Sequence, residues 1–255
     1  MFKDEFQAVA NAGKAKRNLM KNNPVGYFIA AMLAGMFVGF GALISQCIGY
    51  AMTAAGAAGA VKITTAFVFA SALSLVVMAG SELFTGNNFV MASASMKKEV
   101  PWSDTIKLWI FCYIGNLVGS FLIAVLFHFT KVPTGDLGAY FANTAATKAS
   151  GDILDLFFKG IMCNICVCLA VWCGTKMKSE SGKLIMITWC IMIFMVCTFE
   201  HSVANMTYFS IGILDPNGVA ISGSGIAANL IAVTLGNMVG GIVFTALPYY
   251  LISRK

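Results

Sequence analysis

Two short stretches place acidic, amide and imidazole side chains inside otherwise apolar parts of the chain. One holds Glu82 and Asn87 and the other holds Glu200, His201 and Asn205, so that in both an Asn follows a Glu by five positions. Ionisable groups within a lipid-embedded segment are costly to bury and are functional by default, facing a cavity or the interior of a helix bundle. We therefore predict that the two stretches form the two halves of one site.

The composition indicates a membrane protein. The chain has 255 residues, of which 58% are hydrophobic and 11% are charged, and its mean hydropathy is +0.80. A soluble domain carries about 25% charged residues, and a transmembrane helix needs roughly 20 mostly apolar residues. We predict an all-α membrane protein with six transmembrane helices. They are expected over residues 25–48, 63–94, 102–129, 153–173, 184–214 and 226–251.

The second and fifth of these segments are interrupted, at residues 80–88 and 200–203. Non-helical backbone at membrane depth occurs only where protein or a water-filled cavity satisfies it. We expect Thr85 and Ser202 to cap the half-helices that follow the breaks. The N-terminal ends of these half-helices would then favour an anion through their N–H groups and dipoles. The alternative is that both breaks are only packing kinks.

The carboxylates of the two breaks would repel an anion. We therefore expect Glu82 and Glu200 to accept hydrogen bonds from N–H groups of their own loops, with Asn87 and Asn205 stabilising the same loops. His201 is the histidine expected at membrane depth. A neutral imidazole donates one hydrogen bond, and a protonated imidazole carries a charge near physiological pH. Either form can hold a small anion or pass it a proton.

The two halves of the chain are similar to each other. The motif Gly115-Asn-Leu-Val-Gly119 recurs as Gly236-Asn-Met-Val-Gly240, 121 positions later, and the two glutamates are 118 positions apart. Because each half contains three spans, the second copy enters the membrane from the opposite side. The pattern predicts a three-plus-three inverted repeat, whose interrupted helices mark the substrate path. The first and fourth spans show no comparable similarity.

Residues 1–22 precede the six-helix domain, residues 23–255, and are predicted to form a cytoplasmic amphipathic helix on the membrane surface. A partly disordered basic tail is the alternative. With the N-terminus inside, 13 of the 17 Lys and Arg residues lie on the inner side and four on the outer side. This bias predicts that both termini are cytoplasmic. The apolar face of the N-terminal helix is expected to comprise Phe2, Phe6, Val9 and Gly13.

The eight cysteines all fall within apolar segments. Cys163 and Cys166 have the spacing of one half of a zinc knuckle, but no second pair or histidine cluster accompanies them in the sequence. Buried cysteines of this kind act as small packing residues. We predict no disulfide framework, no metal and no cofactor.

Through these motifs the chain resembles the formate/nitrite transporter family over nearly its whole length. Within the family it is most similar to the hydrosulfide ion channel branch. The resemblance is carried by five motifs that follow the family's order: Ser81-Glu-Leu-Phe-Thr-Gly-Asn87, Gly115-Asn-Leu-Val-Gly119, Cys168-Leu-Ala-Val-Trp172, Phe199-Glu-His-Ser-Val-Ala-Asn-Met206 and Gly236-Asn-Met-Val-Gly240.

The resemblance implies an aquaporin-like six-helix protomer, assembled as a homopentamer with one pore per protomer in a bacterial cytoplasmic (inner) membrane. It also implies passage of small monovalent weak-acid anions, with hydrosulfide favoured and formate or nitrite as the alternative. Neither an enzymatic activity nor a nucleic-acid partner is expected. By motif, the substrate path comprises Thr85, Lys148, Asn164 and His201, with Lys148 attracting anions from above the pore. The apolar constrictions comprise Phe69, Leu73, Leu83, Val167 and Phe194.

Two other functions are compatible with parts of this pattern. An intramembrane metal enzyme would use a Glu–His pair, but it needs further ligands at helical spacing, and His201 is alone at this depth. A neutral-solute pore of the aquaporin kind would need no lysine, whereas Lys148 and the two half-helix dipoles favour anions. A bare anion that crosses apolar constrictions faces a large desolvation cost. A lysine above the constrictions and a histidine between them would offset part of that cost.

Overall fold

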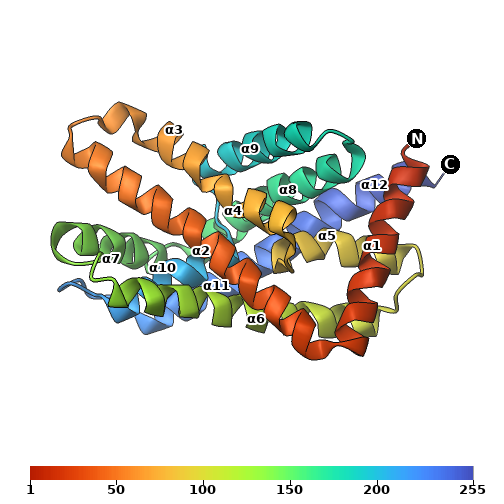
Figure 1. Cartoon of the computed structure of the whole chain (residues 1–255), viewed down its shortest axis with the longest axis horizontal. Helices are drawn as coiled ribbons and strands as arrows, with labels where there is room; N and C mark the ends of the chain where they lie inside the picture. Colours follow the sequence, from red (N-terminus) through yellow and green to blue (C-terminus); the bar gives the residue numbers. More distant parts are fainter. Residues whose placement is uncertain (255) are drawn as a thin grey trace.

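Long apolar helices lie side by side in the computed structural model, which describes residues 1–254, and helix α1 crosses the end of the bundle at which both chain termini lie (Figure 1). The all-helical fold expected from the sequence is confirmed. The elements in chain order are α1 (Lys3–Asn22), α2 (Pro24–Ala54), α3 (Ala58–Phe69), α4 (Ser71–Leu75), the π-helix η1 (Val76–Gly80), α5 (Phe84–Met96), α6 (Trp102–Phe129), α7 (Gly135–Ala149), α8 (Ile153–Lys176), α9 (Glu180–Val196), α10 (Ser202–Leu214), α11 (Gly223–Gly241), the π-helix η2 (Ile242–Ala246) and α12 (Leu247–Ser253).

Within residues 1–254, five helical stretches are long and apolar enough to cross a membrane, and they overlap five of the six expected spans, the second only up to the break at Gly80. The remaining span, expected over residues 184–214, is divided between α9, with 17 residues, and α10, with 13 residues. Neither piece reaches the roughly 20 residues that crossing requires. The two pieces therefore cross together, as two half-helices separated by a break. The five long stretches are Pro24–Ala54, Ala58–Gly80, Trp102–Phe129, Ile153–Lys176 and Gly223–Ser253.

Both breaks start with a residue in the left-handed region of backbone conformation. Gly80 has φ +78° and Thr198 has φ +58°. The next N–H in each case donates back to a carbonyl five residues earlier, Ser81 to Val76 at 3.1 Å and Phe199 to Phe194 at 2.9 Å. This arrangement terminates a helix and satisfies its last carbonyls. The first break is shorter than the expected 80–88, because α5 already begins at Phe84.

The inverted repeat extends further than the sequence motifs indicate. The N–H of Glu82 donates to the Ala30 carbonyl of α2 at 3.1 Å, and the N–H of Glu200 donates to the Lys159 carbonyl of α8 at 3.3 Å. Helices α2 and α8 are therefore equivalent, although their sequences show no similarity. Their partners are equivalent too, since α2 packs on α6 and α8 packs on α11.

Glycines bring these helix pairs into close contact. A Cβ added to Gly119 of α6 would collide with the Met32 carbonyl of α2, and one added to Gly240 of α11 would collide with the Ile161 carbonyl of α8. Both glycines belong to the repeated Gly-Asn-x-Val-Gly motif. Small residues allow backbones to approach in a membrane, where packing rather than exclusion of water holds helices together.

Helix α1 packs on the protein through its apolar face. Its buried face comprises Phe6, Val9, Ala10 and Gly13, and it contacts α2, α5 and α8. Phe2, expected on the same face, is only partly buried and meets the Trp172 ring edge-on at 5.8 Å. Helix α7 takes the corresponding place in the second half and lies at the opposite end of the bundle (Figure 1). This segment lies outside the six spans expected from the sequence.

Candidate functional site

Thr85 and His201 meet at the centre of the protein. The Nε2 atom of His201 lies 3.0 Å from Thr85 Oγ1, and both side chains are buried. The backbone N–H of Ala204 donates to His201 Nδ1 at 3.1 Å. The neutral ring therefore carries its proton on Nε2 and donates it to the Thr85 hydroxyl. His201 itself caps α10, and the expectation that Ser202 does so is wrong, because Ser202 is already the first helical residue.

Two asparagines from neighbouring helices complete the half-helix ends. Asn116 Oδ1 of α6 accepts from the Phe84 N–H at 2.9 Å, and Asn237 Oδ1 of α11 accepts from the Ser202 N–H at 3.0 Å. The expected capping role of Thr85 is therefore also wrong. The N–H groups of Phe84 and Ser202 therefore point at protein oxygens, while the positive end of each helix dipole still favours an anion.

The same asparagines hold the extended backbone of the breaks. The Asn116 amide donates to the carbonyls of Ala31 and Glu82 at 2.8 and 2.9 Å. The Asn237 amide donates to the carbonyls of Gly160 and Glu200 at 2.8 and 3.0 Å. Sequence reasoning missed this role and used the two residues only as a repeat signal. The available signal was the recurrence of a polar Asn between two packing glycines.

Glu200 is paired with a lysine. Lys148 Nζ, on the last turn of α7, lies 2.9 Å from both carboxylate oxygens of Glu200, and Asn205 Nδ2 donates to the same carboxylate at 2.7 Å. The expected hydrogen bonds from loop N–H groups are replaced by these side chains. Lys148 is therefore at the predicted position above the site, but its charge is largely compensated within the protein.

Glu82 has the equivalent arrangement on the α1 side. Lys16 Nζ of α1 lies 2.7 Å from Glu82 Oε1, and Asn87 Nδ2 donates to Oε2 at 2.9 Å. Here too, side chains replace the expected loop N–H donors. Each half of the repeat thus begins with a short helix, α1 or α7, whose lysine pairs with the glutamate of the break. No sequence motif singled out Lys16.

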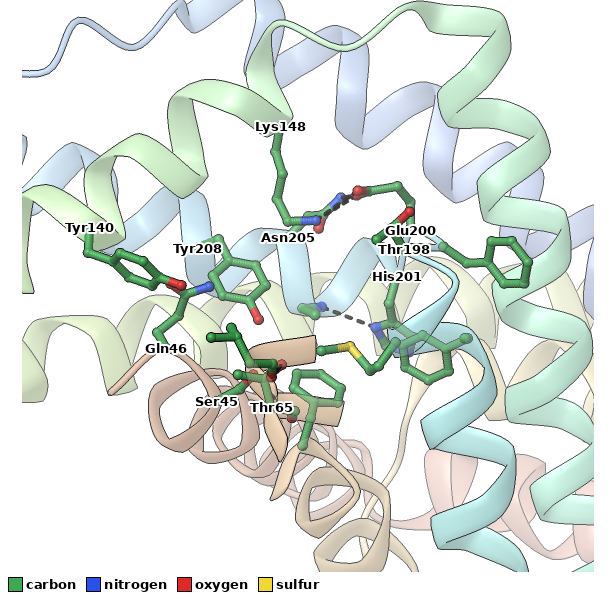
Figure 2. Close-up of a pocket in the computed structure, with 16 residues that line it drawn as sticks. Ser45, Gln46, Thr65, Tyr140, Lys148, Thr198, Glu200, His201, Asn205 and Tyr208 are labelled. Carbon is green, nitrogen blue, oxygen red and sulfur yellow. Dashed lines mark hydrogen bonds and ion pairs between the residues drawn. The ribbon is translucent and has the colours of Figure 1, made fainter. Parts of the chain in front are cut away.

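Two cavities that contain charged side chains approach the central pair from opposite sides. The outer cavity, of about 200 Å³, is lined by Lys148, Glu200, His201 and Tyr208 among others, and Figure 2 shows these side chains converging on it. The inner cavity, of about 480 Å³, is lined by residues of α1, including Lys16, and by the first break. His201 lines the outer cavity and Gly86, next to Thr85, lines the inner one, so the line between the two cavities is a candidate route through the protein.

A narrow apolar chamber separates the two cavities. Its volume is about 10 Å³, which is close to the minimum for one water molecule. Phe194 forms its lid: the ring meets Phe69 edge-on at 6.0 Å and stacks on His201 at 6.1 Å. The structure thus shows the route closed at this chamber. All five predicted constriction residues line it, namely Phe69, Leu73, Leu83, Val167 and Phe194.

Asn164 lies behind the route. Its buried amide donates to the Thr85 carbonyl at 3.2 Å, to Asn88 Oδ1 at 3.0 Å and to the Asn237 carbonyl at 2.6 Å. Asn164 does not line the outer cavity, the inner cavity or the chamber. It therefore positions the first turn of α5. The predicted substrate path required Asn164 to face the route, and it does not.

Helix α1 closes the inner cavity and is held by ion pairs on its other flank. Lys14 lies 3.0 Å from Glu99 in the α5–α6 loop, and Lys21 lies 2.8 Å from Asp104 at the start of α6. The Lys14 ammonium group, which hydrogen-bonds to Glu99, holds the pKa of that carboxyl below its ordinary value. These contacts connect α1 to the half-helix that carries Thr85.

The same fold and length occur in proteins of known class. The sequence model described as formate/nitrite transporter matches residues 3–251. The nitrite transporter NirC of Escherichia coli (strain K12) is 34% identical over 263 aligned positions, covering 100% of this chain and 94% of NirC.

Two solved structures resemble this one. A structure described as an FNT family ion channel superposes with a TM-score of 0.93 and 31% identity over 98% of this chain and 99% of the other. A structure described as a pentameric formate channel with formate bound superposes with a TM-score of 0.77 and 28% identity, over 92% of this chain and 99% of the other. These relatives are transporters and channels rather than enzymes. With a family model across almost the whole length and the apolar helices of a multi-pass membrane protein, this chain belongs to the formate/nitrite transporter family.

Proposed function

We propose that the protein conducts small monovalent weak-acid anions, one pore per protomer, with hydrosulfide favoured. The observation that carries the proposal is the apolar chamber between two cavities that contain charged side chains, with His201 at its edge and Thr85 hydrogen-bonded to His201. His201 lines both the outer cavity and the chamber. An anion that leaves the outer cavity therefore meets the Nε2–H donor at the point where it loses its water.

The chemistry of the pair suits weak acids. A charged ion pays a large desolvation cost in an apolar chamber, whereas the neutral acid pays much less. Proton transfer to the anion requires the imidazolium form of His201, in which Nδ1 carries a second proton. The Ala204 N–H would then lose its acceptor. Proton exchange is thus coupled to loosening of the α10 cap, while hydrogen bonding by the neutral ring needs no such change.

The lysines act as exchangeable partners. Lys148 and Lys16 are each engaged by a glutamate, so an arriving anion competes with Glu200 or Glu82 for an ammonium that is already ordered. The closed chamber opens when Phe194 leaves its stack with His201. This places the barrier at an aromatic side chain rather than at a charged residue.

We infer the identity of the anion from the size of the candidate ions and from what the names of the relatives say they carry. Hydrosulfide is the smallest candidate, and its conjugate acid is the least polar, which suits a chamber of about 10 Å³. Formate and nitrite are the second candidates, supported by the formate bound to one structural relative and by the name of NirC.

The pentameric state of that relative supports a homopentamer here. Both termini lie at one end of the bundle (Figure 1). The excess of basic residues on that side supports cytoplasmic termini in a bacterial inner membrane.

Uptake by proteoliposomes tests the function. Purified protein is reconstituted, and the initial uptake of hydrosulfide, formate, nitrite and chloride is compared over a range of pH. We expect the three weak-acid anions to enter faster than chloride, and hydrosulfide fastest. Swelling in response to an osmotic gradient measures water passage in the same vesicles. Rapid water flow without anion uptake would replace this proposal by a neutral-solute pore.

A further inference from the structure

Thr198 occupies a backbone conformation that disfavours it. Its φ of +58° lies in the left-handed region, where a β-branched residue is a genuine outlier. The equivalent position in the first half, 118 residues earlier, is Gly80, with φ +78°. Both residues end a half-helix with the same hydrogen-bond pattern. Glycine therefore suffices for the turn, and the threonine at the second break needs another reason.

Thr198 lies at the wall of the outer cavity. Thr198 is exposed, lines that cavity, and lies beside Glu200 and His201 in Figure 2. Two other small hydroxyl groups line the same cavity, but Ser45 donates to the Thr65 carbonyl at 3.3 Å and Thr65 to the Val61 carbonyl at 2.7 Å. Within residues 1–254, the Thr198 side chain has no hydrogen-bond partner in the structure.

The charged donor of this cavity is already engaged. Lys148 is 2.9 Å from each oxygen of Glu200. An anion that enters the cavity must compete with Glu200 for this ammonium, so an uncharged donor without a partner is easier to reach. Thr198 offers one at the cavity wall, one residue before Phe199 and three before His201.

We propose that Thr198 contacts the permeating anion in the outer cavity and contributes to its selection. The inference rests on the proposed anion conduction and names a residue that selects among the anions. A hydroxyl donor favours anions whose acceptor is oxygen, such as formate and nitrite. Sulfur is a weaker acceptor, so hydrosulfide gains less. The backbone strain at this position is then retained for the donor that the side chain provides.

Four variants separate the hydroxyl from the strain. Thr198→Val keeps the β-branched shape and removes the hydroxyl, Thr198→Gly removes both, and Thr198→Ser keeps the hydroxyl. Thr65→Val is the matched control, because its hydroxyl already donates to a backbone carbonyl of its own helix. Initial uptake is measured in proteoliposomes with sodium formate and with sodium hydrosulfide, and Tm is measured for each purified variant.

The expected result depends on whether a variant keeps the Thr198 hydroxyl. For formate, Thr198→Val and Thr198→Gly raise the half-saturating concentration about three- to tenfold, the range for one lost hydrogen bond. Thr198→Ser and Thr65→Val stay near the unsubstituted protein. For hydrosulfide, the shift is smaller in every variant. The Tm of Thr198→Gly rises, because glycine accepts this conformation, while that of Thr198→Val does not.

Three results would overturn parts of this picture. Unchanged formate kinetics in Thr198→Val and Thr198→Gly would show that Thr198 only ends the helix and does not contact the anion. The same conclusion would follow if the half-saturating concentrations of the variants correlated with their Tm values and not with the presence of the hydroxyl. If the unsubstituted protein takes up no anion, the proposed function fails as a whole, and that outcome is visible before any variant is compared.

Discussion

Thr85 and His201 face each other at 3.0 Å although 116 positions separate them in the chain. Each stands at the N-terminal end of a half-helix, Thr85 on α5 and His201 as the cap of α10. The two half-helices belong to opposite halves of the inverted repeat, so the contact is the place where the halves meet. His201 lines the apolar chamber, and Thr85 lies behind it as its hydrogen-bond partner.

Removing the imidazole should slow transport and flatten its pH profile. His201→Asn keeps a side chain that caps helices well but cannot reach Thr85. We expect uptake to fall about ten- to hundredfold, from the loss of about 1.5–3 kcal/mol of hydrogen bonding to a charged group. Thr85→Val keeps the imidazole and should retain the pH profile at a lower rate. Unchanged uptake in both variants, measured in proteoliposomes from pH 5 to 8, would remove this pair from the route.

The ion pair in the outer cavity should control both stability and anion entry. Lys148→Met leaves the mostly buried Glu200 carboxylate without its partner, which costs about 3–5 kcal/mol. Glu200→Gln leaves an uncompensated positive charge, so the uptake per folded protein should rise at low ionic strength and less at high salt. The double variant should be more stable than Lys148→Met alone. A double-mutant cycle of Tm values, with uptake at two salt concentrations, measures these effects. Additive Tm changes would show that the pair is not coupled.

The two capping asparagines should be essential for folding. Asn116→Ala removes the partner of the Phe84 N–H and hydrogen bonds to two carbonyls, and Asn237→Ala removes the partner of the Ser202 N–H and hydrogen bonds to two carbonyls in the other half. Each unsatisfied group costs about 1–3 kcal/mol, so we expect a large fall in Tm and in the yield of folded protein. Asn143→Ala, at an exposed position of α7, is the control and should change little. Similar Tm values for all three would contradict the capping role.

The attachment of α1 should weaken in acid. Lys14 holds the pKa of Glu99 below its ordinary value, so the contact stabilises the docked helix above the unfolded-state pKa, roughly pH 4. This contribution is lost as the pH falls through the lower pKa of the folded state. The protection factors of the α1 amides, which correct for the intrinsic pH dependence of hydrogen exchange, should then fall, and Glu99→Gln should lower them already at neutral pH. Glu180→Gln, at an exposed end of α9, is the control. Protection factors in α1 that change neither with pH nor in Glu99→Gln would show that the Lys14–Glu99 ion pair does not hold the helix.

The sequence allowed most of the architecture to be predicted, because the properties concerned are local. Hydropathy over roughly 20 residues identifies a membrane span, and a carboxylate within such a span indicates a break. Glu82 and Glu200 marked both breaks, and the repeated Gly-Asn-x-Val-Gly motif revealed the second copy. The constriction residues came from the family resemblance, and the structure places all five around one chamber.

The partners of the polar groups could not be predicted in this way. Lys16 pairs with Glu82 across 66 positions and Lys148 with Glu200 across 52, and the resemblance placed Lys148 above the pore without indicating that a glutamate engages it. The capping of α5 and α10 by Asn116 and Asn237 likewise depends on helices that approach only because glycines let them.

The chain by itself determined which segments enter the membrane and where they must break, since apolar length and buried charge act on each segment separately. Only the tertiary structure decided which lysine compensates which glutamate, that α1 covers the inner cavity, and that Asn164 stands behind the route. A buried polar group is stabilised by whichever donor or acceptor the packing brings within about 3 Å. That distance is set by all the helices together.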